Sequence, residues 1–271
     1  MTSRYARVLL ILVTAVVVAH GSAFAQAAAT QTKPFEPQVG QPGKDVVWVP
    51  TPQALVEKML DMAKLTAQDF HMDLGSGDGR TVITAAKRGA RAEGIEYNPD
   101  MVALSQKAAQ TAGVADRATF RKADIFETDF SKANVITLFL LPQLNLKLRP
   151  TILNMAPGTR IVSNTFTMED WMPDQTETVG GDCVSWCTAH LWIVPAKAQG
   201  TWDVPGRGTL TLFQNFQMLS GTLGSGQISN AKLRGEDVTF TAGGTTYTGK
   251  VNGSTMTLTA GGQKITATKK S

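Results

Sequence analysis

The sequence predicts an α/β protein with a doubly wound, mostly parallel sheet and a small C-terminal antiparallel β domain. Between residues 45 and 165, apolar runs typical of buried strands alternate with segments whose apolar residues recur at helical spacing. Such alternation predicts a parallel sheet that binds its ligand at the carboxyl ends of the strands. From residue 197 onward, short runs rich in Thr, Val, Phe and Leu alternate with glycine-rich turns, which predicts an antiparallel meander closed or curled into a small barrel.

Caps and breakers place the elements of the α/β part. Thr51 is a suitable N-cap and Pro52 suits the first position of a helix, whereas Gly113 and Pro157-Gly158 end later helices. In chain order we expect a short strand at 45–49, a helix at 52–65, strands ending at 74 and 96 with a helix between them, a helix at 100–113, strands at 117–121 and 134–141, a helix at 142–155, and strands at 159–165 and 190–194.

The segment from Phe70 to Pro99 is the β-α-β unit around which this sheet is organised. Its first apolar run reaches the turn Gly75-Ser76-Gly77-Asp78-Gly79-Arg80, and its second apolar run ends on Glu96. A glycine-rich turn that opens a helix is typical of nucleoside and nucleotide sites. Glu96 lies 21 residues after Gly75, where an acid at the end of the second strand binds both ribose hydroxyls.

The spacing of the turn indicates which nucleoside binds. Dinucleotide-binding units use G-x-G-x-x-G, but Arg80 occupies the position of the third glycine and Gly79 comes one residue early, which disfavours a nicotinamide oxidoreductase. Asp73, directly before the turn, would repel a pyrophosphate but suits a ligand with an ammonium and a sulfonium group. The sequence therefore predicts S-adenosylmethionine as the cofactor, with Asp124 and Ile125 at the adenine.

A simpler interpretation of each of these residues stays open. The glycines could form only a tight turn with Asp73 as a helix cap, and Asp124 could be an ordinary turn residue. The residues that we expect to bind the cofactor are Asp73, Gly75, Ser76, Gly77, Gly79 and Glu96 in this unit, with Asp124 and Ile125 at the end of the third strand.

Residues 1–25 have the order of a secretory signal peptide. Arg4 and Arg7 precede an apolar run from Val8 to Ala19, and small residues lead to a cleavage site after Ala25. The run is shorter than the roughly 20 residues of a membrane span, although an uncleaved anchor is the alternative. The sequence thus predicts a periplasmic or secreted protein, with no stable membrane span after cleavage.

The charge of the mature chain is close to neutral. Loss of two arginines with the leader reduces 26 basic residues to 24, against 22 acidic ones. Because no Lys/Arg run is interleaved with aromatic residues, we expect no nucleic-acid partner. Residues 26–44, rich in Ala, Gln, Thr, Pro and Gly, are expected to form a flexible leader before an enzyme domain at 45–196 and a β domain at 197–271.

The Asp/Thr/Gly-rich segment from Trp171 to Thr188 is expected to be a loop before a closing β-hairpin. It contains Cys183 and Cys187, which in an oxidising compartment would form a local disulfide. Zinc binding with His190 would supply only three ligands, so we expect no metal site, and two buried free thiols are the third possibility. His71 is expected to be a packed strand residue rather than a catalytic base.

Residues 46–166 resemble the class I S-adenosylmethionine-dependent methyltransferases, whose Rossmann-like sheet has seven strands. They are more specifically similar to the lysine methyltransferase group that includes the ATP synthase c-subunit lysine methyltransferases and the non-SET histone lysine methyltransferases. The motifs that carry this resemblance are Val49-Pro50-Thr51-Pro52, Asp73 to Arg80, Leu138 to Gln143, Leu146 to Leu148, and Pro157 to Ser163.

The resemblance implies methyl transfer to an amine, with a protein or small-molecule acceptor. It implies that the segment around Thr51 closes over the cofactor, and that the acceptor channel is framed by Trp48, Thr51, Leu141 and Gln143. The polar Asn/Asp-Pro-Pro-Tyr motif of many amine methyltransferases is replaced by Leu140-Leu141-Pro142-Gln143, so the catalytic residue is unassigned. We therefore predict an exported methyltransferase of a protein lysine amine; the alternative is a non-catalytic module that binds an adenosyl compound.

Overall fold

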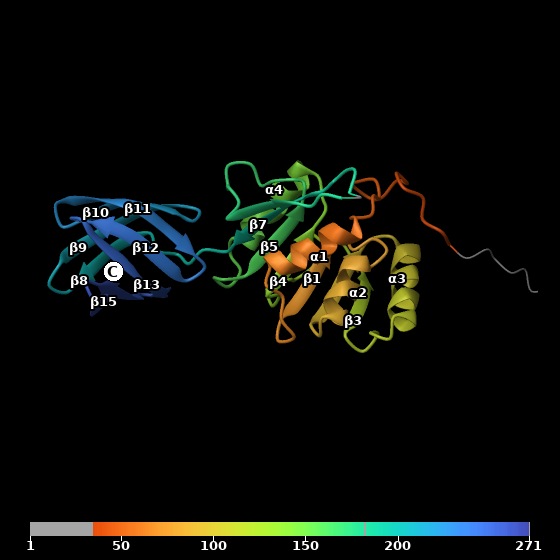
Figure 1. Ribbon diagram of the computed structural model, residues 1–271, viewed down its shortest axis with the longest axis horizontal. Helices are drawn as coiled ribbons and strands as arrows, with labels where there is room; N and C mark the ends of the chain where they lie inside the picture. The colour runs from red at the N-terminus through yellow and green to blue at the C-terminus, as the bar shows by residue number, and fades with distance from the viewer. Residues whose placement is uncertain (1–34, 182, 271) are drawn as a thin grey trace, which may run out of the picture. The chain divides into compact units, whose positions relative to one another are not determined.

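The computed structural model describes residues 35–181 and 183–270 (Figure 1). The predicted signal peptide, with its cleavage site after Ala25, lies outside the described residues. Within the part of the chain that is described, no helix is long and apolar enough to cross a membrane.

The first domain contains a seven-stranded sheet with the strand order β3-β2-β1-β4-β5-β7-β6. The strands β1 to β5 pair in parallel, whereas β7 runs antiparallel to both β5 and β6. This arrangement confirms the predicted doubly wound, mostly parallel sheet. The strands are β1 (Phe70–Leu74), β2 (Arg91–Glu96), β3 (Ala118–Lys122), β4 (Val135–Leu138), β5 (Arg160–Asn164), β6 (Gln175–Thr178) and β7 (Thr188–Ile193).

Four helices cover the sheet, and its apolar residues divide between two layers. The helices are α1 (Gln53–Met62), α2 (Arg80–Lys87), α3 (Pro99–Thr111) and α4 (Pro142–Ile152). One core is formed by residues of α1, α2 and α3 with Ala92 and Phe120, and another by residues of α4 with Met72, Leu74 and Ile136. Since alternate residues of a strand face opposite sides, Asp73 lies on the side opposite to Met72 and Leu74.

The second domain is a closed antiparallel barrel of eight strands, which confirms the predicted C-terminal β domain (Figure 1). Its interior is filled by side chains that include Trp202, Phe240 and Met256. At Gly221 an added Cβ would lie 1.8 Å from the carbonyl oxygen of Thr211, so the close approach of β9 and β10 requires glycine there. The strands are β8 (Gly200–Val204), β9 (Gly208–Asn215), β10 (Met218–Leu223), β11 (Gly226–Arg234), β12 (Asp237–Ala242), β13 (Thr245–Asn252), β14 (Thr255–Ala260) and β15 (Gln263–Lys269).

Two segments differ from the sequence-based expectation. Residues 45–49 are not a sheet strand; they return along residues 40–43, with backbone hydrogen bonds between Gln41 and Trp48 and between Gly43 and Val46, so part of the expected flexible leader is structured. The expected loop at 171–188 contains the edge strand β6. Because β6 is largely exposed, it lacks the apolar alternation that would have predicted it.

Candidate active site

A cavity of about 580 Å³ lies at the carboxyl ends of the parallel strands. Its volume is within the range of roughly 300–1,000 Å³ that small-molecule sites occupy. The cavity is lined by the turn after β1, the residues that follow β2, β3, β4 and β5, and residues 41–51. This is the position that the alternating β and α pattern predicts for a ligand.

The glycine-rich turn between β1 and α2 is a tight backbone cradle. Gly75, Gly77 and Gly79 have φ values of +86°, +52° and +79°, a region that disfavours residues with a Cβ. An added Cβ on Gly77 would lie 2.6 Å from the indole nitrogen of Trp48, and one on Gly79 would lie 2.7 Å from the ring of Phe120. Gly75, Ser76 and Gly77 line the cavity, whereas Gly79 instead allows α2 to start close to the sheet.

Glu96 at the end of β2 faces the glycine-rich turn. Its Oε2 accepts a hydrogen bond of 3.0 Å from the backbone N–H of Gly77, and its Oε1 accepts one of 2.8 Å from Asn98. Each carboxylate oxygen has a further lone pair. Glu96 lines the cavity and can accept hydrogen bonds from two ribose hydroxyls, so its position suits the predicted role.

Asp73 is buried in β1, where the residue is 6% exposed, and it lines the same cavity. Burial raises the pKa of this carboxyl to about 7, and the nearby carboxyls of Asp78 and Glu96 act in the same direction. The hydroxyl of Thr137 donates a hydrogen bond of 2.6 Å to Asp73. A cationic ligand beside Asp73 would favour its ionised form, as the ammonium of S-adenosylmethionine would do.

His71 supports Asp73 from inside the sheet. Its Nε2 lies 2.8 Å from the hydroxyl oxygen of Thr137, whose proton is donated to Asp73, so the imidazole Nε2–H donates to Thr137. Burial lowers the pKa of His71 to about 3, so the ring is neutral. His71 is therefore a packed residue that orients Thr137, and it does not line the cavity.

Arg80 takes the place of the third glycine of the dinucleotide motif. Its guanidinium lies 2.6 Å from the carboxylate of Asp78 and donates a hydrogen bond of 3.0 Å to the backbone carbonyl of Thr51. Arg80 thus ties the glycine-rich turn to the start of α1. The hydroxyl of Thr51 accepts a hydrogen bond of 3.2 Å from Asn164 at the end of β5.

Residues 41–48 line the cavity on the side of Tyr97 and Asp124. Lys44 forms an ion pair with Asp124, and its ammonium lies 4.9 Å from the centre of the Tyr97 ring. The hydrogen bond from Lys44 holds the pKa of the Asp124 carboxyl below its usual value. Ile125 also lines the cavity, but the expected adenine contact of Asp124 would have to share this carboxylate with Lys44.

Only some of the residues predicted to frame the acceptor channel line the cavity. Thr51 and Leu141 line the cavity, and Trp48 does so against Gly77, on the cofactor side rather than the acceptor side. Gln143 is wrongly assigned: it is exposed in the first turn of α4 and is not among the lining residues. Pro142 begins this helix, and the helical turn places Leu144 rather than Gln143 at the cavity.

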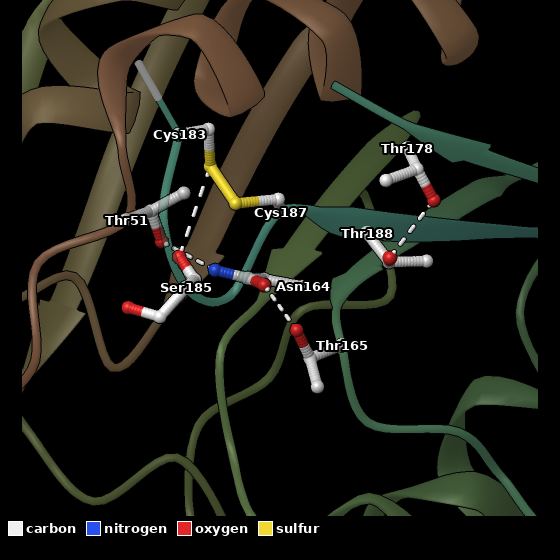
Figure 2. The surroundings of a disulfide bond; sticks show 8 residues. All are labelled: Thr51, Asn164, Thr165, Thr178, Cys183, Ser185, Cys187 and Thr188. Atoms are coloured by element: carbon white, nitrogen blue, oxygen red, sulfur yellow. Dashed lines mark hydrogen bonds between the residues drawn. A yellow bond between two sulfur atoms is a disulfide. The ribbon is translucent and has the colours of Figure 1, made fainter. Parts of the chain in front are cut away.

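Cys183 and Cys187 form a disulfide in the loop between β6 and β7, with their Cα atoms 5.9 Å apart (Figure 2). Figure 2 also shows the hydrogen bond between Asn164 and Thr51. Both imidazole nitrogens of His190 have other partners, the hydroxyl of Thr176 and the backbone carbonyl of Thr165. Across residues 35–181 and 183–270, no group of three or more His, Cys, Asp or Glu side chains could hold a metal ion.

Four further residues of the site were not predicted from the sequence: Asn164 and the aromatic residues Phe139, Phe166 and Trp186. Asn164 is fully buried and hydrogen-bonded to Thr51, whereas the three aromatic residues line the cavity. The run Ser163-Asn164-Thr165 at the end of an apolar strand was a usable signal, because polar residues at that position commonly face a ligand.

The residues present fit an adenosyl cofactor that carries an ammonium group. Asp73 offers a carboxyl for the ammonium, Glu96 offers acceptors for the ribose, and Gly75 and Gly77 of the turn line the same cavity. The strand order, the antiparallel β7, the glycine-rich turn and the acid at the end of β2 together define a class I S-adenosylmethionine-dependent methyltransferase.

Comparisons with known proteins specify the family. Residues 73–175 match the model of the ANTKMT methyltransferase domain. A protein-lysine N-methyltransferase of Saccharolobus islandicus is 41% identical over 152 residues, which cover 55% of this chain and 94% of that protein. The chain belongs to this family of methyltransferases, and its cofactor is S-adenosylmethionine.

Two further relatives extend the comparison. The ATP synthase c-subunit lysine N-methyltransferase of Mus musculus is 35% identical; the match covers 51% of this chain and 56% of that protein, so the chain spans little more than half of its length. A crystal structure of an RNA methyltransferase from Salinibacter ruber in complex with S-adenosyl-L-homocysteine is 46% identical, with a TM-score of 0.52 and coverage of 55% of this chain and 95% of that one.

Proposed function

We propose that this methyltransferase acts on the ε-amine of a lysine in a protein, and that it does so outside the cytoplasm. The single observation that carries the acceptor assignment is the apolar part of the cavity beyond the glycine-rich turn. It is formed by Phe139, Leu140 and Leu141 after β4, Phe166 after β5, and Trp186. The names of the relatives from Saccharolobus islandicus and Mus musculus, both lysine N-methyltransferases, support the same acceptor.

The chain's own residues can supply what this reaction needs. Bound S-adenosylmethionine supplies a methyl group on a positively charged sulfur. Asp73 and Glu96 hold the cofactor at its ammonium and ribose, while Leu140 and Leu141 exclude water from the acceptor side. A desolvated lysine ammonium has a lowered pKa, so it more readily gives up a proton to solvent.

The resulting neutral amine forms the new carbon–nitrogen bond as the carbon–sulfur bond breaks. The products are methyl-lysine, S-adenosylhomocysteine and one proton. Positioning and desolvation can supply much of the rate enhancement of such a displacement, so this assignment requires no strong general base.

The test is methyl transfer from S-adenosylmethionine with a trideuterated methyl group to a mixture of envelope proteins. Mass spectrometry should locate the deuterated methyl group on lysine side chains. A variant with Glu96→Ala serves as the control for cofactor-dependent labelling. Label confined to small molecules would contradict the protein-lysine assignment.

RNA is the second candidate acceptor, because the relative from Salinibacter ruber is described as an RNA methyltransferase. Residues 26–196, which include the whole cavity, have 16 Lys and Arg against 19 Asp and Glu, and this net negative charge disfavours a phosphate backbone. Residues 197–271, by contrast, have 8 Lys and Arg against 3 Asp and Glu. Total RNA therefore belongs in the labelling experiment as a competing acceptor.

The location outside the cytoplasm is supported by the N-terminal sequence pattern and by the Cys183–Cys187 disulfide, a bond typical of oxidising compartments. S-adenosylmethionine is made in the cytoplasm, so an exported enzyme requires a supply of it. Fractionation of the native host followed by N-terminal sequencing tests this proposal. We expect mature protein in the envelope or medium that begins at Gln26; uncleaved protein in the cytoplasm would contradict it.

A further inference from the structure

Three aromatic side chains from separate segments meet in the cavity. The rings of Phe139 and Phe166 have centroids 6.1 Å apart, and the Trp186 ring lies 5.8 Å from Phe139 and 5.6 Å from Phe166. All three residues line the cavity. We call Phe139, Phe166 and Trp186 the aromatic cluster.

The strand order places the aromatic cluster on the acceptor side. Glu96 ends β2 and Asp124 follows β3 on one side of β1, whereas Phe139 and Phe166 follow β4 and β5 on the other side. The next residue after Phe139, Leu140, lies against the glycine-rich turn, since its Cδ2 is 3.2 Å from the Cβ position of Gly75. A cofactor with its ribose at Glu96 and its ammonium at Asp73 would have its sulfonium between these two groups, which leaves the side of β1 with Leu140 and the aromatic cluster for the acceptor.

The backbone of Trp186 has an unusual conformation. Its φ of +58° is in the left-handed region, which is rare for a bulky residue and is found mainly where the surroundings impose it. The residue follows Ser185 within the short loop closed by the Cys183–Cys187 disulfide. Although its ring contacts two phenylalanines, Trp186 is 40% exposed, so it presents part of its surface to whatever enters the cavity.

We propose that the aromatic cluster is the binding site for the alkylammonium side chain of the acceptor, and that the disulfide positions Trp186 for this role. The proposal rests on the proposed function, because it specifies how a lysine is received. Aromatic faces attract cations through the negative charge of their π-systems, and tryptophan does so most strongly. The rings contact the alkyl stem and the ammonium at the entrance, before the amine is desolvated at Leu140 and Leu141.

Fluorine NMR of oxidised full-length protein labelled with 5-fluorotryptophan tests this site directly. Of the five tryptophans, Trp171, Trp192 and Trp202 are fully buried, so their signals serve as internal references. The signals of Trp48 and Trp186 are assigned by their loss in Trp48→Phe and Trp186→Phe. We expect S-adenosylhomocysteine to shift Trp48, and subsequent Nα-acetyl-lysine methylamide to shift Trp186.

Matched probes and variants separate this role from simple packing. Nα-acetyl-norleucine methylamide, which lacks the ammonium, should bind more weakly than the lysine probe. In Trp186→Ala and in the double variant Cys183→Ser/Cys187→Ser, the lysine probe should lose about 5- to 30-fold in affinity, while affinity for S-adenosylhomocysteine changes less than twofold. Val184→Ala, at a 95% exposed position in the same loop, should behave as the unaltered protein.

The outcomes distinguish this proposal from the proposed function. If the lysine probe leaves the Trp186 signal unchanged, or binds Trp186→Ala with unaltered affinity, the aromatic site is contradicted even when lysine methylation is detected. If the probe shifts Trp186 as expected but the methyl group is transferred only to RNA, the cluster binds an alkylammonium group that is not the methyl acceptor, so the lysine assignment fails and the acceptor role of the cluster fails with it.

Discussion

Replacing Asp73 with asparagine should stabilise the protein against unfolding while weakening its affinity for S-adenosylmethionine. The amide keeps an oxygen that can accept the hydrogen bond from Thr137 but does not ionise. In the folded protein, burial raises the pKa of Asp73 from 3.8 to about 7. The buried carboxyl can bind a cation, but its ionisation destabilises the folded protein. Asp73→Asn should remove this destabilisation.

The sign and size of the effect follow from proton binding. Between pH 3.8 and about 7 the folded protein retains a proton on Asp73 that the unfolded chain has lost, so stability falls as pH rises. At about 1.36 kcal/mol per pKa unit, the loss reaches about 4 kcal/mol at pH 8. The stability difference between Asp73→Asn and the unaltered protein should be near zero at pH 4 and grow to about that value at pH 8.

Urea unfolding monitored by fluorescence between pH 4.5 and 8 measures this difference without ligand. Asp69→Asn is a matched control, because we expect it to change the free energy of unfolding in the opposite direction. Burial opposes ionisation of Asp69, but hydrogen bonds from Arg160 and Thr66 outweigh it and hold its pKa below the usual value. Asp69 thus contributes stability above pH 3.8 that is lost as pH falls, so Asp69→Asn should be destabilising at pH 7.

A constant difference between Asp73→Asn and the unaltered protein across this pH range would refute the reasoning. Calorimetry provides the second measurement. Loss of a charge-assisted hydrogen bond of about 1.5–3 kcal/mol should weaken binding of S-adenosylmethionine by one to two powers of ten. Unaltered affinity in Asp73→Asn would remove the assignment of Asp73 to the ammonium group.

Three further predictions concern other residues of the site. Glu96→Ala should weaken cofactor binding by roughly one to two powers of ten in calorimetry, and unchanged affinity would exclude the ribose contact. Lys44→Gln should release Asp124 for the adenine, so cofactor affinity at low salt should rise, by less than tenfold, and should depend less on salt. Weaker binding would show that Lys44 instead stabilises the bound state. In material isolated from the native host, mass spectrometry after alkylation should find Cys183 and Cys187 joined, and two alkylated thiols would contradict this.

The cofactor side of the site could be predicted from the sequence because its signals are local. Gly75, Gly77 and Gly79 are separated by fixed spacing, and Asp73 and Glu96 lie at the ends of short apolar runs that predict buried strands. Arg80 excluded the dinucleotide pattern by its position alone. These features depend on backbone geometry within one β-α-β unit.

The acceptor side depends on contacts between distant segments, which no local pattern contains. Phe139, Phe166 and Trp186 are far apart in the sequence and meet only because β4, β5 and β7 are neighbours in the sheet. Lys44 reaches Asp124 across 80 residues. The error at Gln143 has a similar origin, because the direction of a side chain in the first turn of α4 depends on how that helix packs.

Methylation of protein lysines is tested by transfer of a trideuterated methyl group from S-adenosylmethionine to a defined acceptor mixture. Envelope proteins and total RNA are incubated together with the oxidised enzyme, and both are analysed by mass spectrometry. We expect deuterated methyl groups on protein lysines, with labelling strongly reduced in Trp186→Ala and Glu96→Ala and retained in Val184→Ala. Label found only in RNA, or equal lysine labelling in all three variants, would contradict this expectation.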